Sequence, residues 1–253
     1  MFLSLSETDN SKVSKSYCRI VVKLGSNLLT GSEMSLDVPR MTSIVEQLAT
    51  ILDKGSEVIV VSSGAIVSGR GLLGTVPDHR GVPLRQVFAS VGQSRLMQAY
   101  DRLFGEHGIT VAQALVARAD LIDRLGYLNV RNTLNTLLSL RVVPIVNEND
   151  VVAVEEIQEA RFGDNDNLSA MVANLVDADL LMILTDIAGL YSADPRLDPD
   201  ATLIKRVNTI DGNIEELAGD AYGPKGIGGM TTKIQAAQLA TASGVDVIIA
   251  DGR

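Results

Sequence analysis

The chain has 253 residues, of which 46% are hydrophobic, and its net charge is −9. A chain of this size and composition can bury a substantial core, as one large or two small domains. The acidic balance disfavours nonspecific nucleic-acid binding, which needs clustered lysine and arginine, and no run of about 18 uncharged apolar residues is present to cross a membrane.

The N-terminal segment, residues 1–17, is polar and has little basic charge at its start. This composition disfavours a signal peptide and predicts a flexible leader on a cytoplasmic protein. Cys18 is the single cysteine, so a disulfide within the chain and a cysteine metal cluster are excluded. We expect Cys18 to pack as a small hydrophobe in a buried strand.

Short β-branched runs alternate with longer amphipathic segments along the first half of the chain. In chain order, the sequence predicts a strand at 18–24, a helix from Met41 to Leu52 that stops at Gly55, a strand at 57–62, a glycine-rich segment up to Gly74, a helix at 84–104, a strand at 109–115, a helix at 126–140, a strand at 142–147 and a hairpin at 151–162.

The second half continues the alternation. It predicts a helix at 167–176, a strand at 180–185, a polar excursion at 191–224, a helix after Gly229 and a strand at 245–250. Apolar strands separated by helices indicate an α/β fold with a mainly parallel sheet covered on both faces. We expect one domain over 18–253, with an N-terminal lobe at about 18–176 and a C-terminal lobe at about 177–253.

Polar residues follow several of the predicted strands, and in a parallel α/β sheet ligands bind beyond the carboxyl ends of the strands. These residues are Lys23, Ser62 to Gly64, Asn147 to Asp150, and Thr185 with Asp186. This placement makes them the first candidates for a binding site.

Two glycine clusters suggest phosphate or nucleotide binding. Gly69, Gly71 and Gly74 form a G-x-G-x-x-G pattern, but it begins too far after the strand for a dinucleotide site, and we favour close packing of a helix instead. The other cluster, GPKGIGGMTTK at 223–233, is not a P-loop. It nevertheless places glycine N–H groups and Lys233 at a helix start, which suits phosphate, although such loops are also often just flexible.

Several other kinds of site have little support. The chain contains only two histidines, His79 and His107, both in polar surroundings, so histidine catalysis is disfavoured. No G-x-S-x-G motif is present for a hydrolase. Asp164 and Asp166 begin like a calcium loop, but the glycine that such a loop requires is replaced by Ser169.

A resemblance to a known family runs from about Arg19 to the end of the chain. It is carried by VVKLGSNLLT, VVSSGAIVSGR, VGQ, PIVNENDVVA, FGDNDNLSA, ILTDIAGLYSADPR and GIGGMTTK. The chain resembles the amino acid kinase family, in its glutamate 5-kinase branch. The resemblance implies a three-layer αβα sandwich and ATP-dependent phosphorylation of the γ-carboxylate of L-glutamate to γ-glutamyl phosphate, the first step of proline synthesis.

The residues are consistent with that reaction. A glutamate side chain, with a pKa of about 4.3, is already ionised at neutral pH and needs no base to attack a phosphoryl group. The transfer needs positioning and neutralisation of charge, which lysines can supply. The resemblance implies that Lys23 contacts the transferred phosphate, that Lys233 lies on the nucleotide side, and that Asp166 holds both lysines in place. Each lysine taken alone could equally be solvated.

The resemblance also implies the binding residues. Asp150 and Asn165 resemble glutamate-binding residues, while Ser63 and Gly64 would receive a carboxylate at a helix start. Asp164 and Asn167 are interpreted as the helix cap. The nucleotide-binding residues implied are Lys23, Thr185, Asp186, Gly226, Ile227, Gly228, Gly229, Met230 and Lys233. ATP would bring Mg²⁺, held mainly by phosphates and water, and no protein ligand is assigned.

Alternatives remain within and outside this family. N-acetylglutamate kinase is the nearest, although an acylated amino group carries no charge for Asp150 to pair with. A non-catalytic amino-acid sensor would not need both lysines and Asp166. The resemblance further implies a homo-oligomer, proline as a feedback inhibitor and hand-over of the product to γ-glutamyl phosphate reductase. We expect no C-terminal PUA domain in this chain.

Overall fold

Six β-branched segments form one parallel sheet in the computed structural model, which describes residues 16–31, 35–74, 81–152, 165–195, 197–220 and 229–253. The strands are β1 (Arg19–Leu24), β2 (Glu57–Ser62), β3 (Val111–Val116), β4 (Val143–Glu148), β5 (Leu180–Thr185) and β6 (Asp246–Asp251). Their order across the sheet is β3-β4-β2-β1-β5-β6. Strands β2 to β4 are added on one side of β1 and strands β5 and β6 on the other, so the strand order switches direction between β1 and β5. Such a switch point is where ligands bind in open α/β sheets.

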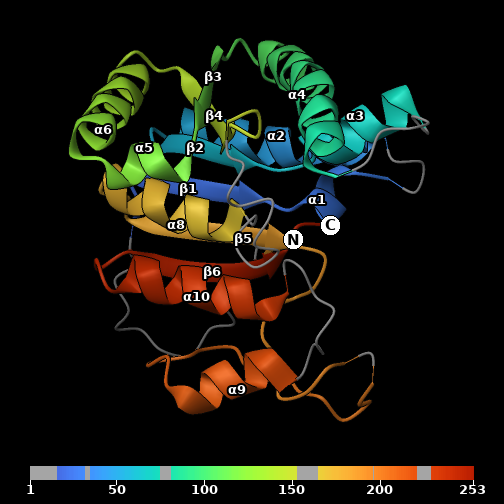
Figure 1. Ribbon diagram of the computed structural model, residues 1–253. Coiled ribbons are helices and arrows are strands. Elements are labelled where there is room, and N and C mark those ends of the chain that lie inside the picture. Colours follow the sequence, from blue (N-terminus) through green and yellow to red (C-terminus); the bar gives the residue numbers. More distant parts are fainter. Residues whose placement is uncertain (1–15, 32–34, 75–80, 153–164, 196, 221–228) are drawn as a thin grey trace.

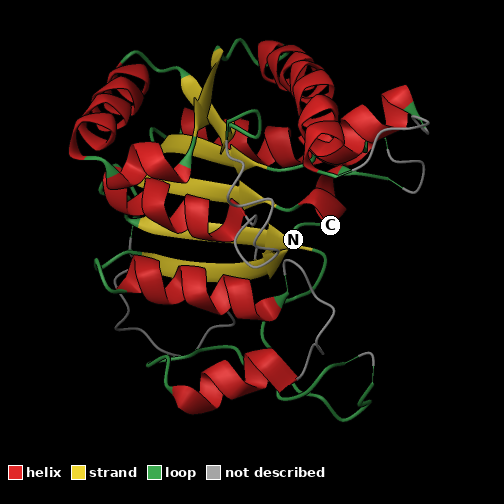
Figure 2. Ribbon diagram, in the orientation of Figure 1, coloured by secondary structure: helices red, strands yellow, loops and turns green. Residues whose placement is uncertain are grey.

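Helices cover both faces of this sheet (Figures 1 and 2). They are α1 (Ser26–Leu29), α2 (Val38–Asp53), α3 (Ala65–Leu73), α4 (Val82–Gly105), α5 (Arg118–Ile122), α6 (Arg124–Ser139), α8 (Asn165–Leu175), α9 (Gly212–Asp220) and α10 (Met230–Thr241). The buried side chains of α2 and α4 pack on one face, and those of α5, α6, α8 and α10 pack on the other. This arrangement confirms the predicted three-layer αβα sandwich.

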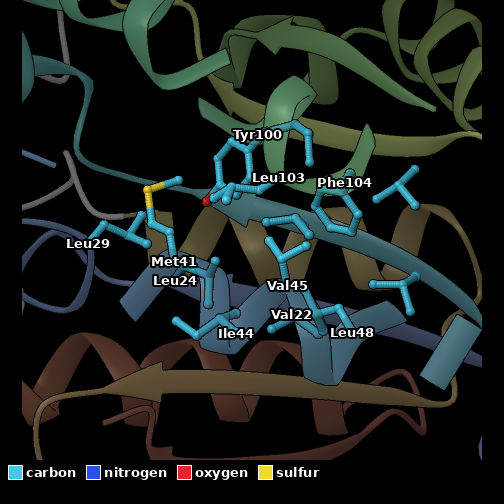
Figure 3. Close-up of a cluster of buried hydrophobic side chains, with 14 of the residues drawn as sticks. Val22, Leu24, Leu29, Met41, Ile44, Val45, Leu48, Tyr100, Leu103 and Phe104 are labelled. Carbon is cyan, nitrogen blue, oxygen red and sulfur yellow. The ribbon is translucent and has the colours of Figure 1, made fainter. Parts of the chain in front are cut away.

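The core on the α2 and α4 side is built from residues that alternate along β1 (Figure 3). Val22 and Leu24 point into it and meet α2 residues spaced three and four apart, including Ile44 and Leu48. Tyr100 on α4 is also buried there, and its hydroxyl lies 2.8 Å from Ser62 Oγ. Burial raises the pKa of Tyr100 well above its usual range, so this hydroxyl stays neutral.

The opposite core takes the other residues of the same strands. Val21 and Ile183 contribute to it together with α8 and α10, which explains why the strands are apolar on both faces. A smaller cluster lies under α9, where Ala218 packs with Leu190 and Met230. Figure 1 shows α9 beyond α10, away from the sheet.

The contact between α3 and α4 accounts for the G-x-G-x-x-G pattern. A Cβ atom on Gly69 would lie 1.9 Å from the carbonyl oxygen of Phe88, and one on Gly92 would lie 1.7 Å from that of Ala65. Only glycine allows the two backbones to approach so closely. The expected role in helix packing is therefore confirmed for Gly69, whereas Gly74 has open space where a Cβ would lie and ends α3 with a φ of 63°.

Several expectations differ from the structure, among them the burial of Cys18, the polar excursion at 191–224 and the start of α8, which is Asn165 rather than Asn167. Cys18 is exposed and lies one residue before β1, which begins at Arg19. Its backbone N–H donates to Asp179 Oδ2 at 2.7 Å. The predicted polar excursion contains α9, whose apolar side covers its own small core. Most of the predicted hairpin, residues 153–162, lies outside the described residues, as do Asp164 and His79.

Candidate active site

A buried aspartate joins two buried lysines at the switch point of the sheet. Asp166 is fully buried, and Lys23 and Lys233 are 3% and 5% exposed. Asp166 forms an ion pair through Oδ1 with Lys23 Nζ, and its Oδ2 lies 3.1 Å from Lys233 Nζ. The two ammonium groups outnumber the carboxylate, so this trio carries a net positive charge that suits an anionic ligand.

The fold explains why these three residues meet. Lys23 lies two residues after Val21 on β1, so its side chain points to the face covered by α8 and α10. Asp166 is in the first turn of α8, and Lys233 is in the first turn of α10. The two helices pack side by side against the sheet and start at the same edge. The structure thus brings together the three residues predicted to act in catalysis.

Thr232 completes this cluster and was not predicted from the sequence. Its hydroxyl donates to Asp166 Oδ2 at 2.8 Å and also lies 2.9 Å from the carbonyl oxygen of Gly229. Thr232 therefore links the carboxylate to the start of α10. Its position next to Lys233 was the available signal, but a threonine in the first turn of a helix is too common to be informative.

A chain of side-chain amides extends from the cluster across the sheet. Asn165 Nδ2 donates to the Ser62 carbonyl oxygen at 2.8 Å, to Ser63 Oγ at 2.9 Å and to Asn147 Oδ1 at 2.9 Å. Asn147 Nδ2 in turn donates to Gln93 Oε1 at 2.9 Å. The predicted substrate-binding residues Ser63 and Asn165 are thus in direct contact, held by amides that the sequence did not connect.

The other predicted substrate residues flank this chain. Gly64 has a positive φ of 100° and caps α3, a backbone conformation that favours glycine. Asp150 lies in the turn after β4, where burial raises its pKa to about 6 and the charge of Arg85 partly opposes that rise. A carboxylate that loses solvation in this way gains from a cationic partner.

The predicted nucleotide residues lie on the other side of the lysines. Thr185 ends β5, and its hydroxyl donates to Asp186 Oδ1 at 3.1 Å. Gly229 caps α10 without a side-chain hydrogen bond, and Met230 begins the helix, so backbone N–H groups are available for an anion. Gly226, Ile227 and Gly228 lie outside the described residues.

The described side chains around Asp166 form no metal site of their own. No group of three or more histidine, cysteine, aspartate or glutamate side chains that could hold a metal occurs in the described part of the chain. The carboxylate at the centre, Asp166, is already neutralised by two lysines.

Within the described ranges, no helix is both long enough and apolar enough to cross a membrane.

The sequence profile of the amino acid kinase family matches residues 19–251. The chain belongs to the amino acid kinase family. The matched range spans the whole described sheet and the positions of Lys23, Asp166 and Lys233.

Glutamate 5-kinases are among its similar relatives in this family. The chain is 59% identical to the glutamate 5-kinase of Dehalococcoides mccartyi (strain ATCC BAA-2266 / KCTC 15142 / 195), over 93% of this chain and 63% of the relative. It is 53% identical to that of Herpetosiphon aurantiacus, with the same coverage. The chain therefore spans less than two thirds of the length of the curated relatives it matches.

Several solved structures share the fold at low sequence identity. Carbamate kinase from Giardia lamblia bound to AMP-PNP matches with a TM-score of 0.62 and 20% identity, over 92% of each chain. Aspartate kinase from Synechocystis matches with a TM-score of 0.61 and 17% identity, over 93% of this chain and 38% of the other. These likenesses establish the fold alone.

Proposed function

We propose that the chain transfers the γ-phosphoryl group of ATP to the γ-carboxylate of L-glutamate, forming γ-glutamyl phosphate. The observation that carries this proposal is the buried contact of Asp166 with Lys23 and Lys233, in a chain of which 93% aligns at 59% identity with a glutamate 5-kinase. A non-catalytic sensor would have no need for two buried cations, because it neutralises no transferring phosphate.

The two lysines have distinct roles in this proposal. Lys23, from the N-terminal lobe at 18–176, contacts the phosphoryl group as it moves, and Lys233, from the C-terminal lobe at 177–253, neutralises the phosphates of the nucleotide. Asp166 positions both ammonium groups without accepting a proton. Since transfer passes through a transition state with charge spread over the phosphoryl oxygens, fixed cations lower its barrier.

The acceptor and the nucleotide lie on opposite sides of these lysines. Asp150 pairs with the α-ammonium of glutamate, Asn165 contributes to the glutamate site, and Ser63 and the backbone near Gly64 receive a carboxylate. Thr185, Asp186 and the segment 226–230 at the start of α10 bind the nucleotide. Mg²⁺ supplies charge neutralisation on the ATP phosphates when it is bound.

The choice of free glutamate over N-acetylglutamate depends on Asp150. Burial already disfavours the ionised form of the Asp150 carboxylate, so a ligand at this position should bring a positive charge. The α-ammonium of free glutamate does so, whereas an acetylated amino group carries no charge. We further propose a cytoplasmic homo-oligomer, inhibition by proline, and delivery of the acyl phosphate to γ-glutamyl phosphate reductase.

The proposal is tested by measuring ADP formation in the presence of ATP and Mg²⁺, and by trapping any acyl phosphate with hydroxylamine; transfer to UMP forms no acyl phosphate and is detected by ADP formation alone. L-Glutamate, N-acetyl-L-glutamate, L-aspartate and UMP are compared as acceptors, with and without the Asp166→Ala substitution. Hydroxamate from L-glutamate alone, lost in the variant, is the expected result. Turnover of N-acetylglutamate in preference to glutamate would establish the alternative kinase, and no product from any acceptor would favour a sensor.

A further inference from the structure

Gln93 on α4 is a buried polar side chain that the proposed chemistry does not yet use. It is 8% exposed, and its Nε2 has no hydrogen-bond partner among the described residues. The residue belongs to the VGQ segment at 91–93. Leaving both N–H groups of a buried amide without acceptors is costly, so the arrangement calls for a ligand or a water molecule.

The orientation of the Gln93 amide is fixed by its neighbours. The backbone N–H of Glu148 donates to Asn147 Oδ1 at 2.9 Å, so the atom of Asn147 that faces Gln93 is the donor Nδ2. Gln93 must therefore accept through Oε1 and keep Nε2 for another partner. Because a backbone N–H can only donate, the oxygen and nitrogen of the Asn147 amide cannot trade places without losing the bond from Glu148. The Gln93 amide cannot be flipped either, since two donors would then face each other.

Gln93 also lies at the correct end of the proposed acceptor site. Lys23 is on β1, and Asn147, which binds Gln93, is on β4, with β2 between them. Two strand spacings are roughly 10 Å, enough to place a short dicarboxylate along the sheet edge. The reacting carboxylate must lie at the lysine end, so the other end of the acceptor approaches β4.

The same face of α4 is held against the turn that carries Asp150. Gln86, seven residues or about two helical turns before Gln93, donates to the carbonyl oxygen of Val151 at 2.9 Å. The charge of Arg85 acts on Asp150. Gln93, a donor on α4, and Asp150, an acidic residue after β4, thus border the same end of the site. This pair suits the α-carbon of an amino acid, which bears a carboxylate and an ammonium group.

We propose that Gln93 is a specificity-determining residue that donates a hydrogen bond from Nε2 to the α-carboxylate of the amino-acid acceptor. This inference rests on the proposed function. Asp150 and Gln93 then recognise the two charged groups on the α-carbon of the acceptor, and the lysines receive the γ-carboxylate at the other end.

Two substitutions separate a direct contact from an indirect one. Gln93→Met removes the donor and also the acceptor for Asn147, whereas Gln93→Glu keeps an acceptor for Asn147 and replaces only the donor. Gln98→Met and Gln98→Glu, at an exposed position five residues along the same helix, are the matched controls. The Michaelis constants for L-glutamate and ATP are measured by the hydroxamate assay, and thermal melting checks that each variant folds.

Both Gln93 variants should raise the KM for L-glutamate roughly 10- to 100-fold, the value of a hydrogen bond to a charged group, with the KM for ATP within about twofold of wild type. An increase in Gln93→Met without one in Gln93→Glu would mean that Gln93 acts only through Asn147, and no increase in either would also overturn the proposal. If Gln93→Glu does not fold, Gln93→Met is measured in an Asn147→Ala background. A direct contact keeps its effect there, and an indirect one loses it.

Failure of the underlying function has a different signature. A wild-type chain that yields no hydroxamate from L-glutamate contradicts the proposed function and, with it, the role of Gln93. A wild-type chain that is active, with both Gln93 variants unchanged, contradicts only the role of Gln93.

Discussion

Neutralising Asp166 should destabilise the chain far more than neutralising an exposed aspartate. Asp166→Asn keeps the size of the side chain but removes the carboxylate that pairs with the buried ammonium groups of Lys23 and Lys233. Removing one partner of a buried ion pair costs about 3–5 kcal/mol, and we expect the lower end because the amide oxygen still accepts one hydrogen bond. At roughly 2–4 °C per kcal/mol for a chain of this size, Tm should fall by about 6–12 °C.

The control for this prediction is Asp177→Asn. Asp177 pairs with Arg131, but its side chain is 70% exposed, and asparagine tolerates its positive φ of 51°. Exposed pairs contribute about 0–1 kcal/mol, so Tm should change by less than about 4 °C. Calorimetry at pH 7 measures both variants. If Asp166→Asn melts within 2 °C of the control, the argument from the loss of two buried ion pairs is wrong.

The other predictions concern three further positions in the molecule. Because burial raises the pKa of Asp150 to about 6, kcat/KM for glutamate should fall as the pH drops through 6, and Asp150→Asn should remove this limb of the profile. The same burial penalises the ionised form, so Asp150→Asn should stabilise the unliganded chain above pH 6 but not below about pH 4, as measured by urea unfolding; equal effects at both pH values would contradict the shift. Gly69→Ala should cost about 3 kcal/mol or more, because its Cβ would meet a backbone carbonyl at 1.9 Å, while Gly105→Ala, with open space around its Cβ, should be neutral or stabilising in the same urea assay. Cys18 is exposed, so the native chain should react with a thiol reagent about as fast as the unfolded chain, and a native thiol that stays unreactive for hours would show that it is buried after all.

The sequence predicted the strands well because each is a short, mainly apolar run between clear breaks. The run LLMILT coincides with β5, and the start of β3 was misplaced by two residues. The short helices α5 and α9 were missed, since five and nine residues give too few turns for a helical period to stand out. Cys18 was placed inside a strand that begins only at Arg19, an end effect that hydrophobicity cannot resolve.

The candidate site could be predicted only in part. Lys23, Asp166 and Lys233 were connected by family resemblance, because no periodic pattern links positions so far apart in the chain. The amide chain from Asn165 through Asn147 to Gln93 was not predicted, since it depends on three elements meeting at one sheet edge. Asn147 had been noted only as a strand-end residue, and the orientation of its amide is fixed by a backbone N–H that sequence does not reveal.

The most direct test of the central claim follows an oxygen atom. L-Glutamate labelled with ¹⁸O in its side-chain carboxylate is incubated with the chain, ATP, Mg²⁺ and hydroxylamine, and the phosphate released when an amine attacks the acyl carbon and breaks its C–O bond is analysed by mass spectrometry. Attack by the γ-carboxylate places its own oxygen in the bond to phosphorus, so the account predicts phosphate carrying one ¹⁸O atom. ATP consumption that yields only unlabelled phosphate would contradict it, because water rather than glutamate would then be the acceptor.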